Sequence, residues 1–199
     1  QLVTSQSENI KLIAKTAGRP PGIFIAARGT SDNAARYAKY VFGLHNRIPV
    51  TLAAPSLFSV YHQPPELKNL LVMGISQSGE SPDLIAVMEG AKAQGCQTLV
   101  ITNQPQSPVG EIADYLIDIQ AGPELSVAAT KSYTCQLTAI ALLSAAWSST
   151  TQQNQDLISL PDRSEDILEQ EDQISNNATR YRYMDQCVVL GRGFNYATA

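Results

Sequence analysis

The chain has 199 residues, a net charge of −4 and a hydrophobic content of 44%. That length provides for one domain with a substantial core and some additional sequence, and the composition is that of an ordinary globular protein. The acidic balance, without any basic run or aromatic–basic stripe, argues against nucleic acid as a partner.

The cysteines and the apolar runs indicate the compartment. Cys96, Cys135 and Cys187 are far apart and odd in number, and each lies in an apolar stretch. This pattern fits neither a disulfide framework nor a metal cluster, so we expect buried thiols in a reducing cytoplasm and no metal site. No signal peptide is visible, and no apolar run approaches the roughly 18 residues that a membrane span needs.

Short apolar segments alternate with segments of helical pattern through most of the chain. We expect helices at 1–17, 33–44, 82–95, about 107–113 and about 126–147, and strands at 23–27, 48–54, 70–75, 97–102 and 115–120. Thr30, Ser31 or Asp32 is expected to cap the second helix, and Ser81 the third, with Pro82 in its first turn. Because the strands are apolar without alternation, they predict an α/β fold with a parallel sheet covered on both faces.

The last quarter of the sequence has a different composition. A polar connector, SSTTQQNQD, follows Trp147, and a mostly polar helix is expected from about 162 to 184. The segment CVVLGRGFNYATA (187–199) then repeats the order of IFIAARGTSDNAA (23–35): apolar strand, Arg-Gly, polar turn and helix start. We therefore expect a first domain at 1–150, a linker and helix at 151–185, and the truncated start of a second domain at 186–199.

Two turns rich in serine and threonine follow the first and third strands. The longer one, GISQSGESPD (74–83), lacks the last glycine of a nucleophile elbow, and no histidine follows His62 to serve as its base. Neither turn has the G-x-G-x-x-G of a dinucleotide site or the G-K-[ST] of a Walker loop. Nucleotide binding and serine hydrolysis are therefore disfavoured.

A phosphate group bound by neutral donors remains. The free N–H groups and the dipole of a helix N-terminus attract anions. Ser76, Gln77, Ser78 and Ser81 add side-chain donors at one turn, and the Gly29-Thr30-Ser31 turn brings a second helix N-terminus to the same sheet edge. The alternative is that these residues only cap helices.

Three segments resemble the sugar isomerase (SIS) domain of glucosamine-6-phosphate synthase and its relatives: ARGTSDNAARYAKY, SQSGESPD and AGPELSVAATKSYTCQL. GRGFNY (191–196) resembles the opening of the second isomerase domain of that family. The likeness covers about residues 23–145. It implies a flavodoxin-like three-layer αβα sandwich with a five-stranded parallel sheet, two such domains in each protein, and a homodimer that completes the active sites.

The resemblance also implies the ligand, a hexose 6-phosphate or amino-sugar 6-phosphate, with no metal or organic cofactor. Carried over by motif, the phosphate is held by the following residues: Thr30, Ser31, Ser76, Gln77, Ser78 and Ser81. Glu124 matches an acidic residue beside the sugar and is the candidate catalytic residue, and Val127 supplies backbone contacts. Ala129 stands where the family commonly has serine, which puts one hydroxyl contact in doubt.

Three functions are compatible with this resemblance. The sequences ARGTSDNAARYAKY and APSLFSVY most resemble those of relatives without a glutaminase domain. These are glucosamine-6-phosphate deaminases that yield fructose 6-phosphate and ammonia, with other catalytic groups outside this sequence. The alternatives are the isomerase half of glutamine–fructose-6-phosphate aminotransferase and the sugar-phosphate-sensing domain of a transcriptional regulator. A helix-turn-helix preceding Gln1 would favour the last.

Overall fold

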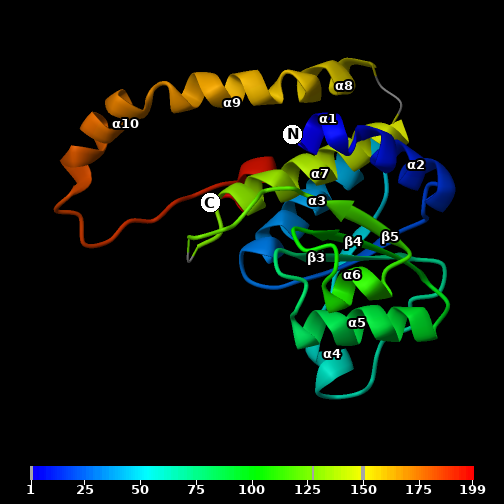
Figure 1. Cartoon of the computed structure of the whole chain (residues 1–199). Helices are drawn as coiled ribbons and strands as arrows, with labels where there is room; N and C mark the ends of the chain where they lie inside the picture. The colour runs from blue at the N-terminus through cyan, green and yellow to red at the C-terminus, as the bar shows by residue number, and fades with distance from the viewer. Residues whose placement is uncertain (1, 127, 149–150) are drawn as a thin grey trace.

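A parallel sheet forms the centre of the molecule. The computed structural model describes residues 2–126, 128–148 and 151–199. Within them, five parallel strands are ordered β2-β1-β3-β4-β5 (Figure 1). Their bounds are β1 (Ile23–Ala27), β2 (Val50–Leu52), β3 (Leu71–Ser76), β4 (Gln97–Thr102) and β5 (Tyr115–Asp118). This is the flavodoxin-like order, so the predicted α/β fold class is confirmed.

Helices cover both faces of the sheet. On one face lie α1 (Leu2–Ser5), α2 (Ser7–Ala17), α3 (Thr30–Asn46) and α7 (Lys131–Ser148). On the other lie α4 (Ser56–Ser59), α5 (Pro82–Ala93) and α6 (Pro108–Ile112). Three layers result, as the sequence predicts.

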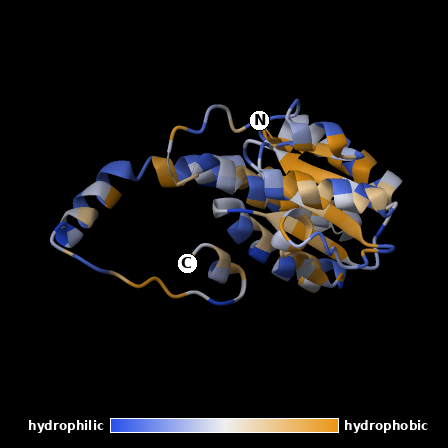
Figure 2. Cartoon of the chain, turned by 90° about the horizontal axis from the view of Figure 1, so that it is seen from below, coloured by the Kyte–Doolittle hydropathy of each residue, from blue (hydrophilic) through white to orange (hydrophobic). Residues whose placement is uncertain are grey.

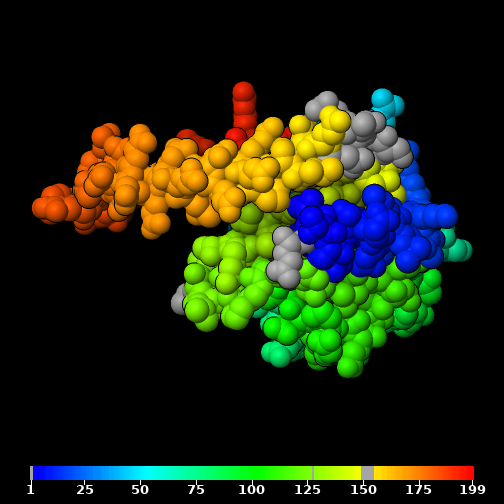
Figure 3. Space-filling model, turned by 45° about the horizontal axis from the view of Figure 1, so that its top comes forward, coloured from blue at the N-terminus to red at the C-terminus, as the bar shows by residue number. Residues whose placement is uncertain are grey.

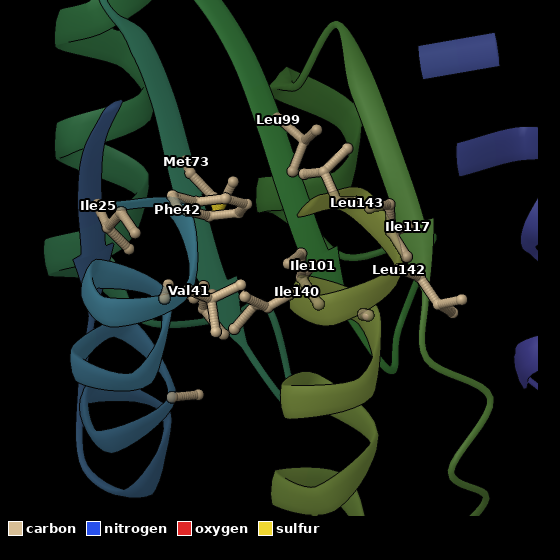
Figure 4. Packing of buried hydrophobic residues seen from close by; sticks show 14 of the residues in the cluster. Ile25, Val41, Phe42, Met73, Leu99, Ile101, Ile117, Ile140, Leu142 and Leu143 are labelled. Atoms are coloured by element: carbon tan, nitrogen blue, oxygen red, sulfur yellow. The ribbon is translucent and has the colours of Figure 1, made fainter. Parts of the chain in front are cut away.

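Alternate strand residues fill two separate cores. In β3, Leu71, Met73 and Ile75 pack against α3 and α7, whereas Val72 faces the α5 side, and all four are buried. Figure 4 shows Val41 and Phe42 of α3 meeting strand and α7 side chains in the larger core. Burial on both faces explains why the strands read as continuous apolar runs.

The element boundaries differ from the predicted ones in places. The expected strand 48–54 shortens to β2, an edge strand that pairs only with β1. The N-terminal helix is interrupted at Gln6, between α1 and α2. The expected cap of α3 was wrong, because the helix already begins at Thr30 and the cap position belongs to Gly29, whose φ is +58°. Ser81 does occupy the cap position of α5, with Pro82 following, but its side chain makes no capping bond.

The segment after α7 contains more helix than expected. Part of the predicted connector forms α8 (Thr151–Ile158), followed by α9 (Leu160–Leu168), α10 (Glu171–Ala178) and the short 3₁₀ turn η1 (Thr179–Tyr181). The single helix expected at 162–184 is thus divided. Pro161 accounts for the break between α8 and α9, because proline lacks an N–H and clashes with the preceding turn. Figure 3 shows this part projecting from the domain as an arm.

Residues 187–190, expected as a strand, form none in the described structure. Val188 and Leu190 are 83% and 88% exposed, and Figure 2 shows this apolar stretch beyond the end of the hydrophilic arm. The 3₁₀ turn η2 (Gly193–Ala197) then packs on α3, where the Phe194 ring lies 6.0 Å from that of Tyr37. The boundaries proposed for a second domain stay a prediction.

The three thiols differ in burial. Cys96 is buried and Cys135 is half-buried, and burial raises the pKa of both thiols. Cys187 is exposed, so the expectation that it is buried was wrong. Its apolar neighbours at 188–190 are exposed with it, because no sheet pairs with them.

Candidate functional site

The two predicted phosphate turns lie at neighbouring strand ends. Ala27, the last residue of β1, is paired in register with Ile75 near the end of β3. The order of the sheet reverses between these two strands, since β1 leads outwards to β2 while β3 leads to β4. In open parallel sheets, ligands bind beyond the carboxyl ends of the strands at this reversal.

The turn after β3 is fixed by its own hydrogen bonds. Ser76 Oγ accepts a bond from the Gly79 amide (2.9 Å), and Ser78 Oγ accepts one from the Glu80 amide (3.4 Å). The Gln77 carbonyl accepts from the Asn103 amide at 3.2 Å. Ser76 is buried, whereas Gln77, Ser78 and Ser81 are half-buried at the entry to α5. Polar side chains are therefore gathered in front of a helix N-terminus.

Gly79 is required by the shape of this turn. Its φ is +67°, a conformation that side chains with a Cβ disfavour, and an added Cβ would lie 1.9 Å from Ser107 Oγ. The turn after β3 is thus packed directly on the start of α6.

An ion pair joins the two turns. Arg28, which follows β1, contacts the Asp83 carboxylate in the first turn of α5, and Ser59 Oγ donates to the same carboxylate at 2.7 Å. The ion pair ties the first turn to the N-terminus of α5. The guanidinium and the carboxylate neutralise each other beside the turns. The donors predicted at the turns are therefore the neutral hydroxyl and amide groups, not Arg28.

Ser31 differs from the other hydroxyl groups in its surroundings. It lies in the first turn of α3, is only 7% exposed, and its Oγ accepts a hydrogen bond from Gln136 Nε2 of α7 at 3.0 Å. Thr30, beside it, is half-buried. The first turn is therefore in contact with α7 as well as with the sheet edge.

Glu124 caps the N-terminus of α7. Its Oε2 accepts bonds from the Ser132 amide (2.9 Å), the Ser132 hydroxyl (2.8 Å) and the Thr130 amide (3.1 Å). These bonds, the Ser132 amide foremost, lower the pKa of the Glu124 carboxyl from 4.5 to about 2. A carboxylate held in this way is a weak base at neutral pH, and its bonds tie Glu124 to the start of α7. Its catalytic role stays a prediction.

The segment that carries Glu124 is connected to the turn after β3 through Asn103. The Asn103 side chain donates to the Gly122 carbonyl and accepts from the Ala121 amide, both at 2.8 Å, while its backbone contacts Gln77. In Figure 1 the loop after β5 and the start of α7 lie on one side of the molecule.

Some of these residues were missed by sequence reasoning. Asp83, Asn103 and Gln136 act through partners distant in the sequence, and no local motif distinguishes them. Val127, predicted for backbone contacts, lies outside the described residues. In the described part of the chain, no group of three or more His, Cys, Asp or Glu side chains could hold a metal ion. No helix there is both long and apolar enough to cross a membrane.

Residues 19–146 match the SIS domain family. The chain belongs to this family. Glutamine–fructose-6-phosphate aminotransferase (isomerizing) of Clostridium acetobutylicum is 35% identical over 186 residues, 89% of this chain and 30% of that protein. The Gloeobacter violaceus enzyme of the same name is 39% identical over 187 residues, again 89% and 30%. The chain thus spans about a third of the length of the curated relatives it matches.

Several solved structures have the same fold. A protein from Silicibacter pomeroyi DSS-3, assigned as a phosphosugar isomerase, aligns with a TM-score of 0.78 and 34% identity over 81% of this chain and 50% of that one. The C-terminal domain of the Francisella tularensis aminotransferase reaches a TM-score of 0.81 at 24% identity, over 98% and 62%. Vibrio vulnificus NanR, complexed with ManNAc-6P, reaches 0.61 at 16% identity, over 77% and 61%. The last two likenesses show the fold alone.

Proposed function

We propose that this SIS domain binds the phosphate of a hexose 6-phosphate or amino-sugar 6-phosphate between its two hydroxyl-rich turns. One observation carries the proposal. The hydroxyl groups of Ser31, Ser76 and Ser78 each accept a hydrogen bond from the protein, and none of their protons has an acceptor among the described residues. A hydroxyl that already accepts can still donate, so each is available to an anion.

The backbone supports the same ligand. The amide of Ser78 also has no acceptor in the described part of the chain, and the N-termini of α3 and α5 both begin at this edge. Aligned helix dipoles and free N–H groups favour a phosphate dianion without a buried lysine. Thr30, Gln77 and Ser81 complete the proposed donor set, and Val127 stays a predicted backbone contact.

We further propose that the full-length protein is an aldose–ketose isomerase of the deaminase type. It would convert glucosamine 6-phosphate and water into fructose 6-phosphate and ammonia by moving a proton between C1 and C2. A base for that step works best with a pKa near the operating pH, and the pKa of about 2 for Glu124 is far below it. We therefore propose that Glu124 shapes the sugar side of the site, and that groups outside residues 1–199 transfer the proton.

A second candidate is the isomerase half of glutamine–fructose-6-phosphate aminotransferase. The names of the relatives at 31% to 39% identity favour it. The sensing domain of a regulator has weaker support, since NanR shares the fold at 16% identity. The predicted homodimer and cytoplasmic location stay predictions, and sedimentation of the full-length protein tests the first.

The deciding experiment uses the full-length protein with glucosamine 6-phosphate, and follows ammonia and fructose 6-phosphate. Release of both without glutamine supports the deaminase. Synthesis of glucosamine 6-phosphate from fructose 6-phosphate only when glutamine is present would instead support the aminotransferase. Phosphosugar binding without either turnover would support the sensor.

A further inference from the structure

Gln136 is a buried polar residue of α7, and it has a larger polar group than the other buried polar residues of that helix, which are serines and a threonine. It is 1% exposed, and its Nε2 donates to Ser31 Oγ at 3.0 Å. Its other amide atom, Oε1, is buried and has no hydrogen-bond partner among the described residues. The hydrophobic neighbours Ile140 and Leu143 on the same helix show that the helix packs as core.

This arrangement is unfavourable for stability taken alone. A buried amide oxygen without a partner loses its hydration and gains nothing in return, whereas methionine or leucine would fill similar space without that loss. The glutamine therefore needs a reason other than packing. Its single bond ends on a hydroxyl of the proposed phosphate site.

We propose that Gln136 is a positioning residue that directs the hydroxyl proton of Ser31 towards the sugar phosphate; this rests on the phosphosugar-binding function proposed above. By donating to Ser31 Oγ, the amide occupies an acceptor position and holds the side chain in one rotamer. The proton of Ser31 then points away from Gln136, and donation into its oxygen strengthens the hydroxyl as a donor.

The direction in which phosphosugar affinity changes when Gln136 is substituted distinguishes an amide that donates to Ser31 from one that accepts from it. If the amide were turned round, Oε1 would accept the Ser31 proton and compete with the phosphate for it. Removing Gln136 would then tighten phosphosugar binding. In the arrangement observed, removing it weakens binding.

The contact also lies close to the Glu124 cap. Ser132, which bonds Glu124, precedes Gln136 by four residues, so both lie on one face of α7. Substitution at Gln136 leaves the bonds between Glu124 and Ser132 in place. A change in phosphosugar affinity can thus be assigned to the contact with Ser31.

The test is titration calorimetry of Gln136→Met with glucosamine 6-phosphate, together with thermal melting. We expect Kd to rise about three- to tenfold, the value of one hydrogen bond between neutral groups, and the Tm to stay unchanged or rise. In a Ser31→Ala background the same substitution should weaken binding no further, because the hydroxyl it positions is gone. Gln136→Leu serves as the second variant if the methionine variant does not fold.

Thr138→Val is the matched control. Thr138 lies on the same helix, is 8% exposed, and its hydroxyl donates to the Thr134 carbonyl within α7. We expect this substitution to leave Kd unchanged.

Two different failures can be told apart. The positioning role is overturned if Gln136→Met binds as tightly as the wild type or tighter, or if its effect adds fully to that of Ser31→Ala. If Ser78→Ala still weakens binding in that case, the proposed phosphosugar site stands without the positioning role. No binding of glucosamine 6-phosphate or fructose 6-phosphate by the wild-type chain overturns the proposed function and the inference with it.

Discussion

Substituting Gly79 by alanine tests whether the turn after β3 is built for its ligand. The backbone there has a φ of +67°, and the new Cβ would lie 1.9 Å from Ser107 Oγ and 2.5 Å from Ser107 Cβ. A positive φ costs an L-residue about 1–2 kcal/mol, and overpacking a well-filled site adds about 1–3 kcal/mol. We therefore expect the free energy of unfolding to fall by about 2–5 kcal/mol in a urea titration.

The affinity for glucosamine 6-phosphate should fall as well. The Gly79 amide bonds to Ser76 Oγ at 2.9 Å, so displacing this residue moves one of the proposed phosphate donors. We expect Kd, measured by calorimetry, to rise about tenfold or more, which corresponds to about 1.4 kcal/mol of lost binding free energy per factor of ten.

Gly95→Ala provides the matched control. Gly95 follows the far end of α5 with a φ of +72°, and nothing lies within 4 Å of its added Cβ. At Gly95 only the cost of the positive φ applies, so the free energy of unfolding should fall by about 1–2 kcal/mol. Ser107→Gly in the Gly79→Ala chain should restore part of the loss by removing the clash. The reasoning is refuted if Gly79→Ala is as mild as Gly95→Ala in both stability and affinity.

The remaining predictions concern charge and hydroxyl donors. Ser76→Ala and Ser78→Ala should each weaken glucosamine 6-phosphate binding about fivefold in calorimetry, as loss of one neutral hydrogen bond predicts; unchanged affinity in both places the phosphate elsewhere. Arg28→Met should weaken phosphate binding most at low salt, because Asp83 then carries an unpaired negative charge at the start of α5, and adding Asp83→Asn should restore it. The folded-state pKa of Glu124, about 2, lies below its ordinary value of 4.5, so its contribution to stability is present above about pH 4.5 and lost as the pH falls towards 2. Thermal melts across this range should show a shallower dependence on pH in Glu124→Gln, and an unchanged slope would contradict the cap.

The sheet could be predicted because its signals are local. Strand β3 is buried along its whole length, and β4 is buried except for Gln97, so their apolar composition distinguishes them from the helices on either side. The β2 strand was overextended, because the apolar residues around it continue beyond the point where pairing with β1 stops. The local sequence pattern thus predicts which strands exist and in what order they follow along the chain better than it predicts where each strand ends.

The two donor-rich turns were expected at one edge of the sheet and lie there, the phosphate site itself stays a prediction, and the contacts that join the turns to the rest of the fold were missed. Donor-rich turns can be read from short motifs, but the pairing of Ser31 with Gln136 joins residues 105 positions apart, and that of Arg28 with Asp83 joins residues 55 apart. The expected strand at 187–190 was wrong for a related reason. An apolar run becomes a strand only where a neighbouring strand can accept its backbone bonds, and the described residues provide none.

The polar groups around the SQSGESPD turn are paired so that the cation beside it is neutralised. Arg28, the cation beside the turns, is bound to Asp83, and this pair brings no net charge to the phosphate. Ser31, Ser76 and Ser78 accept hydrogen bonds from an amide side chain and two backbone amides, so their own protons stay available to the ligand that we propose. Neutral donors at two helix N-termini bind a dianion with a smaller desolvation penalty than a buried lysine would carry in the empty site. Hydrogen-bond pairing within the fold, more than formal charge, therefore makes this edge of the sheet suited to a phosphate.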